Sequence, residues 1–82
     1  MAQAFVTIHC LRSDESKIMQ NLEEISEVIE DDMLVGNYEI ICKIAAPTYN
    51  DISEIISKRI RKMPGIKSTT TINIINNQGF TR

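Results

Sequence analysis

Residues 4–11 form a short apolar run that restricts the fold more than any other part of this sequence. Successive side chains of a β-strand point to opposite faces of its sheet, so the run divides into two sets. One set is Ala4, Val6, Ile8 and Cys10, and the other is Phe5, Thr7, His9 and Leu11. Because both sets contain large apolar residues, we expect a strand here that is covered on both sides.

The chain has 82 residues, which is room for a single domain. A domain of this size hides only about 60% of the surface that its unfolded chain exposes, so association with a second copy is a natural route to further burial. We expect one domain over residues 1–76, followed by a frayed polar tail at residues 77–82. One of the two covers of the first strand is then another subunit.

The composition excludes several classes of protein. A net charge of −2 lacks the basic excess of a nucleic-acid-binding protein, and a hydrophobic fraction of 43% is ordinary for a globular domain. No apolar run approaches the roughly 18 residues of a membrane helix, and no basic and apolar leader opens the chain. We therefore expect a cytoplasmic protein that binds neither membranes nor DNA directly.

Two amphipathic helices are predicted. The first begins near Ser13, a residue type that caps helices, and the second begins at Thr48, which has the spacing of a capping box with Asp51. The second helix ends before Gly65. Each helix has an apolar stripe at helical spacing that faces the core. The first stripe is Ile18, Leu22 and Ile25 with Met19 alongside, and the second is Ile52, Ile55, Ile56, Ile60 and Met63.

Three further strands complete the pattern. Residues 28–35 have strand character interrupted by three acids at 30–32, which predicts an edge strand or a bulge. The Gly36-Asn37 pair has the chemistry of a tight hairpin turn, so residues 38–44 form an antiparallel neighbour. Residues 67–75 form the last strand. The strand at 38–44 has one apolar face and one mixed face, as a subunit interface would have, made of Glu39, Ile41 and Lys43.

This order of strand, helix, strand, strand, helix, strand predicts an α+β domain with the ferredoxin-like βαββαβ fold. Right-handed crossovers place both helices on one face of a four-stranded antiparallel sheet. The other face is left uncovered, and exposed apolar patches of this kind usually mark association surfaces. We expect dimerisation through this face, which carries Phe5, Leu11, Ile41 and one set from residues 72–75.

No catalytic or metal-binding site is predicted. His9 is the one histidine, and it cannot easily share a metal ion with Cys10, because adjacent residues of a strand point to opposite faces. Cys10 and Cys42 lie in apolar segments, which favours inert buried thiols, although a disulfide between neighbouring strands is an alternative. The rival hypothesis is a small ferredoxin-like enzyme or metal-binding protein that uses His9 and the two cysteines.

Residues 58–62 contain the one basic cluster of the chain, Lys58-Arg59-Ile60-Arg61-Lys62. On a helix the cluster forms a positive face opposite the isoleucine stripe, and Glu54 is placed to pair with Lys58 at i+4. A short basic run in an acidic protein, with no aromatic residues for base stacking, is a weak indication of nucleic-acid binding. A solvated helix face is the favoured interpretation.

The hairpin at residues 35–39 and the threonines at 69–71 provide backbone groups, hydroxyls and one carboxylate suited to a small zwitterion. Glu39 can pair with an ammonium group. The plainer alternative is that Gly36-Asn37 only makes the turn and that the threonines only favour a strand.

Residues 34–40, Leu-Val-Gly-Asn-Tyr-Glu-Ile, and residues 60–71, which contain Pro-Gly-Ile-Lys-Ser-Thr-Thr-Thr, resemble the effector domain of the Lrp/AsnC regulators, also called the RAM domain. The resemblance extends from the first strand to about residue 75 and implies a stand-alone RAM protein without the helix-turn-helix, a class known mainly from archaea and some bacteria. Such a protein acts on transcription indirectly, by assembling with itself or with full-length regulators.

The resemblance also implies a mode of assembly and a ligand. Family members pair sheet to sheet as dimers, four dimers form an octamer, and amino acids bind at the interface between dimers without a cofactor. Carried over by position, the ligand-binding residues are Val35, Gly36, Asn37, Tyr38 and Glu39, with Thr69 and Thr71 from the last strand.

Overall fold

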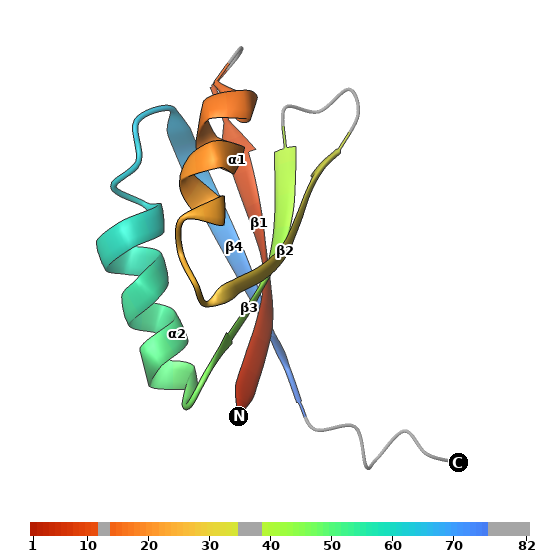
Figure 1. Ribbon diagram of the computed structural model, residues 1–82, viewed down its shortest axis with the longest axis vertical. Helices are drawn as coiled ribbons and strands as arrows, with labels where there is room; N and C mark the ends of the chain where they lie inside the picture. The colour runs from red at the N-terminus through yellow and green to blue at the C-terminus, as the bar shows by residue number, and fades with distance from the viewer. Residues whose placement is uncertain (12–13, 35–38, 76–82) are drawn as a thin grey trace.

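The computed structural model describes residues 1–11, 14–34 and 39–75 (Figure 1). Its elements follow the predicted order and confirm the βαββαβ pattern. They are β1 (Ala2–Cys10), α1 (Glu15–Glu23), β2 (Val28–Leu34), β3 (Glu39–Ala46), α2 (Tyr49–Ile55), the π-helical turn η1 (Ile56–Ile60) that continues α2, and β4 (Ile66–Ile74).

The four strands form one antiparallel sheet in the order β2-β3-β1-β4. Both helices lie on the same side of this sheet (Figure 1). The first strand is therefore central, with Thr7 opposite Ile41 of β3 on one side and Thr70 of β4 on the other. This is the ferredoxin-like arrangement that the sequence predicts.

The core lies between the helices and the covered face of the sheet. Side chains of β1 and β3 alternate strictly between buried and more exposed positions, which confirms the predicted division of the first strand into two sets. The predicted helix stripes also pack here. The buried set is Ala2, Ala4, Val6, Ile8, Cys10, Ile18, Leu22, Ile25, Ile40, Cys42, Ile44, Ala46, Ile52, Ile56 and Ile60.

Both cysteines are buried as free thiols in this core. Burial, with a smaller contribution from the Asp31 carboxylate, raises the pKa of Cys42 from 9.0 to about 12. Burial also raises the pKa of Cys10. The predicted burial of the two thiols is confirmed, and burial disfavours the thiolate, which is the reactive form.

The start of α2 has the predicted capping box. The hydroxyl oxygen of Thr48 accepts a hydrogen bond from the backbone N–H of Asp51 at 3.1 Å, and the Thr48 backbone N–H donates to the Asp51 carboxylate at 3.2 Å. The start of α1 differs from the prediction: Asp14 occupies the N-cap position, and the predicted cap at Ser13 lies outside the described residues.

The end of the α2 and η1 helix turns sharply at Gly65, where φ is 92°. A Cβ atom at this position would lie 2.7 Å from the Oδ2 atom of Asp14, so glycine is required both for its backbone conformation and for space. The Gly65 carbonyl accepts a hydrogen bond from the Leu11 backbone N–H at 2.7 Å. This turn therefore joins the end of the helix layer to the end of β1.

The second strand lies at the edge of the sheet, with a register shift between Val28 and Glu30. The sequence predicts either an edge strand or a bulge from the acids at 30–32, and the structure has both features. The predicted Gly36-Asn37 turn lies outside the described residues, but β2 and β3 pair antiparallel as that turn requires. None of the helices described is long and apolar enough to cross a membrane.

Candidate functional site

The sheet face that carries no helix, called the open face below, presents an apolar centre across three strands. Phe5 of β1 lies between Lys43 of β3 and Ile72 of β4 in the pairing register, and Ile41 lies two pairs further along, on the same face. The Phe5 side chain is 36% exposed and Ile72 is 57% exposed. Apolar side chains in this number on one face are typical of an association surface.

Charged groups surround this apolar centre. The Lys43 ammonium lies 5.7 Å from the centroid of the Phe5 ring, within the range of a cation–π interaction. At one end of the face, His9 Nδ1 lies 3.5 Å from Glu39 Oε2. Leu11, which the sequence places on this face, follows the end of β1 and is 48% exposed. The open face therefore combines apolar and charged groups, as predicted for a subunit interface.

Among the predicted ligand-binding residues, Glu39 is the first residue of β3 and lies on the open face. The other hairpin residues, Val35, Gly36, Asn37 and Tyr38, lie outside the described residues. Glu39 is partly exposed, and its carboxylate lies next to the imidazole of His9, which no sequence motif connects with it. The cross-strand pairing of β1 and β3 brings these two side chains together.

Thr69 and Thr71 lie on the covered side of the sheet, because they pair with Ile8 and Val6 of β1, whose side chains are in the core. The Arg61 guanidinium donates a hydrogen bond from Nε to the Thr69 hydroxyl at 2.8 Å. A cavity of about 350 Å³ lies beside this pair, lined by Ser53, Ile56, Ser57, Arg61, Thr71 and Asn73.

The three predicted site residues that the structure describes are therefore not brought together within one chain. Glu39 and the two threonines lie on opposite faces of the sheet, and β1 separates their strands. A pocket that used all three would combine surfaces from more than one copy of the chain.

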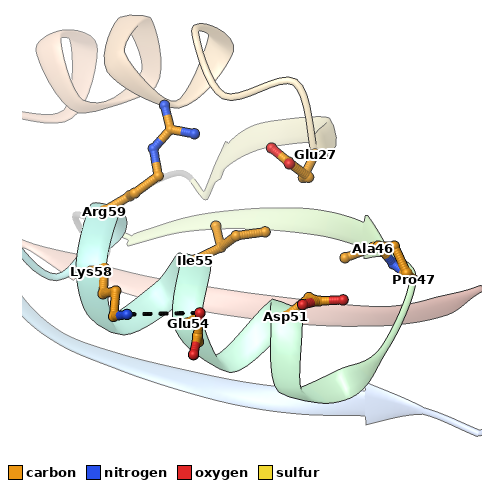
Figure 2. Close-up of a pocket in the computed structure, with 8 residues that line it drawn as sticks. All are labelled: Glu27, Ala46, Pro47, Asp51, Glu54, Ile55, Lys58 and Arg59. Carbon is orange, nitrogen blue, oxygen red and sulfur yellow. Dashed lines mark ion pairs between the residues drawn. The ribbon is translucent and has the colours of Figure 1, made fainter.

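A second cavity, of about 460 Å³, is lined by charged and apolar residues from separate segments that no sequence motif connects (Figure 2). One wall of this cavity is formed by α2 and η1. The rest is formed by the segment that joins α1 to β2 and by the segment that joins β3 to α2. The lining residues are Glu27, Ala46, Pro47, Asp51, Glu54, Ile55, Lys58 and Arg59. The predicted pair of Glu54 and Lys58 is present at 3.7 Å.

Among the residues that the structure describes, metal-binding groups do not gather in any one place. Within residues 1–11, 14–34 and 39–75, no three His, Cys, Asp or Glu residues are placed to hold one metal ion. His9 lies on the open face and Cys10 in the core, as the alternation along a strand requires. The geometry gives no support to a metal site built from His9 and the two cysteines.

Comparison with known proteins adds the family. A model of the family described as the Lrp/AsnC ligand binding domain matches residues 3–78. The regulatory protein AsnC of Haemophilus influenzae is 30% identical over 64 residues, which cover 78% of this chain and 43% of that protein. The chain thus spans less than half the length of this relative.

Two solved structures are similar over nearly their whole length. The protein FFRP-DM1 has a TM-score of 0.85 and 33% identity, with 92% of this chain and 100% of that chain covered. A hypothetical protein of Pyrococcus horikoshii has a TM-score of 0.85 and 30% identity, with 100% and 99% covered. The fold described above is therefore shared with proteins of nearly the same length.

Proposed function

The chain belongs to the family of Lrp/AsnC ligand-binding domains, and from this premise we propose that it is an amino-acid-binding and oligomerising module that modulates transcription indirectly. The family is one of regulatory ligand-binding domains and not of enzymes. The single observation that carries the proposal is the open face, whose apolar centre at Phe5, Ile41 and Ile72 has no helix to cover it.

In this proposal the open face pairs with the same face of a second copy. A symmetric dimer uses one surface patch on both subunits, and a face with an apolar centre and charged surroundings suits such pairing. Four dimers then assemble into an octamer, and the module also joins full-length regulators of the same family. The net charge of −2 lacks the basic excess of a DNA-binding protein, so in this proposal the module acts through these partners and not through its own contact with DNA. Its place of action in this proposal is the cytoplasm.

The amino acid binds where copies meet, at residues 35–39 of one copy, with Thr69 and Thr71 contributed by another. The placement of Glu39 and the threonines on opposite faces supports a shared pocket. Glu39 pairs with the ammonium group of the ligand and exchanges its present partner, His9, for it. A ligand that binds between copies shifts the population toward the assembly that contains its site.

Native mass spectrometry with and without a panel of amino acids tests the proposal. We expect dimers and larger assemblies of dimers, with at least one amino acid retained by the assembly and its population increased. A chain that stays monomeric at all concentrations and retains no amino acid would contradict both parts of the proposal.

Glu39→Gln tests the site more directly, since the change removes the charge but keeps the size of the side chain. We expect at least tenfold weaker amino-acid binding, or about 1.4 kcal/mol, with an unchanged melting temperature. Glu24→Gln is the matched control, because Glu24 is exposed at the end of α1. His9→Ala separates the two roles of Glu39: binding that survives His9→Ala but not Glu39→Gln assigns the carboxylate to the ligand.

A further inference from the structure

The cavity of about 460 Å³ beside α2 is far from the proposed hairpin site (Figure 2). Glu39 begins β3, and Ala46, which ends the same strand, lines the cavity. Seven residue-to-residue steps along the strand separate the two positions by roughly 23 Å. All the lining residues belong to one chain, so the cavity is complete in a monomer.

Most of the charged groups around this cavity already have partners. The Asp51 carboxylate accepts hydrogen bonds from the backbone N–H and the hydroxyl of Thr48 in the capping box. Glu54 pairs with Lys58 at 3.7 Å, as the dashed line in Figure 2 marks. These groups shape the cavity, but each already has a hydrogen-bond or ion-pair partner within the chain.

Two opposite charges remain. The Glu27 carboxylate accepts a hydrogen bond from the neighbouring Ser26 hydroxyl at 3.2 Å and has no cationic partner among the residues that the structure describes. The Arg59 guanidinium makes no hydrogen bond or ion pair with any residue that the structure describes. Figure 2 shows the Arg59 and Glu27 side chains above Ile55, with Ala46 and Pro47 at the right of the view.

We propose that this cavity is a second binding site, for a free α-amino acid with an apolar side chain. The ligand's ammonium group meets Glu27, its carboxylate meets the fork of Arg59, and its side chain packs on Ile55, Ala46 and Pro47. Arg is the residue best suited to a carboxylate because it offers two parallel N–H donors. The volume lies within the range of about 300–1,000 Å³ that is typical of small-molecule pockets.

The backbone at Arg59 is a second observation in favour of a site. Residues Ile56–Ile60 form a π-helical turn, in which the Arg61 backbone N–H donates to the Ile56 carbonyl at 2.8 Å. A π-turn is rare and interrupts the regular geometry of an α-helix. Such turns are frequently found at functional sites. Here the turn carries both Lys58 and Arg59 into the lining of the cavity. This inference goes beyond the proposed function, because it concerns a site within one chain.

Chemical-shift titration with L-valine tests the assignment. We expect saturable shifts of the amide resonances of Ala46 and Ile55. Two analogues are the ligand controls: 3-methylbutanoate lacks the ammonium group, and isobutylamine lacks the carboxylate. Each should bind at least tenfold more weakly, because each leaves one of the two charges in the cavity unpaired. Equal shifts from both analogues and from valine would show simple ionic adsorption and overturn the proposal.

Charge-removing variants locate the effect. Arg59→Gln and Glu27→Gln should each weaken valine binding at least tenfold at this cavity, whereas Lys62→Gln, on an exposed residue outside the lining, should not change it. Wild-type affinity in Arg59→Gln would overturn the assignment. The result is independent of the hairpin site: valine binding lost in Glu39→Gln and kept in Arg59→Gln contradicts this inference alone. Conversely, the absence of Glu39-dependent binding for every amino acid of the panel contradicts the proposed function alone.

Discussion

The two faces of the sheet are built from the same strands but have different compositions. On the covered face, Val6, Ile8, Ile40 and Ile44 are completely buried, and no buried polar side chain occurs among the residues described there. On the open face, their neighbours in the chain include His9, Glu39 and Lys43 beside Phe5 and Ile41. The difference indicates that folding stability comes from one face and that the other is available for association.

The largest contrast between the faces should appear when the same substitution is made on each. Ile8→Ala leaves a cavity in the covered face, where Ile8 is fully buried, and should lower the free energy of unfolding by about 2–5 kcal/mol. Ile72→Ala, at 57% exposure, should cost less than about 1 kcal/mol in a dilute monomer. Urea denaturation measures both values.

Protein concentration sharpens this test. If the open face pairs with a second copy, the cost of Ile72→Ala should rise with concentration, whereas the cost of Ile8→Ala should not. Equal costs for the two variants in dilute solution would contradict the division of roles between the faces.

The next prediction concerns the dissociation constant of the dimer and not the stability of the fold. Phe5→Glu places a charge at the apolar centre of the open face and should weaken dimerisation at least tenfold, or about 1.4 kcal/mol. Gln20→Glu adds the same charge at an exposed position of α1 and is the control. Analytical ultracentrifugation gives both dissociation constants, and a Phe5→Glu dimer as strong as the control would place the interface elsewhere.

The covered face also predicts a pH dependence. Because the pKa of Cys42 is raised from 9.0 to about 12, the folded protein keeps this proton while the unfolded chain loses it. The free energy of unfolding should therefore be fully retained below pH 9 and should fall as the pH rises from 9 to 12, by up to about 1.4 kcal/mol per pH unit. Cys42→Ala should have a smaller slope over this range, and an identical slope would contradict the assignment.

The smallest effect is expected on the open face. The Lys43 ammonium over the Phe5 ring should contribute about 0.5–1 kcal/mol in an exposed setting. A double-mutant cycle with Lys43→Met and Phe5→Leu isolates this coupling in the monomer. A coupling energy above about 2 kcal/mol would indicate that the pair is desolvated, and therefore that the open face is already covered.

Much of the fold follows from local sequence patterns. The Ile52, Ile56 and Ile60 spacing and the Thr48 cap fix α2, and the alternation along residues 4–11 fixes the two faces of β1. These signals are local because helix and strand periods relate residues that are close in the chain. The three acids of β2 also predict an edge strand, because charged side chains are tolerated where a strand has only one neighbour.

The candidate site could be predicted only in part. A motif suggests that Glu39 and Thr71 bind a ligand, but which face of the sheet each occupies depends on strand register across β1, which no local pattern specifies. The cavity beside α2 joins Glu27 and Arg59 from separate elements, and the basic run at 58–62 is equally typical of a solvated helix. The π-turn at Ile56–Ile60 has no sequence signal that we recognise.

The two edges of the sheet set a limit on how the chain can polymerise. The β2 edge carries exposed Glu30 and Asp32 and an irregular register, and charged side chains and bulges are the devices that protect an edge strand against pairing. The β4 edge lacks acids between Ile66 and Ile74 and can accept one more strand. A fibre requires every subunit to offer two adhesive edges, and this chain has one. Extension of the sheet through its edges is therefore expected to stop at a pair of chains.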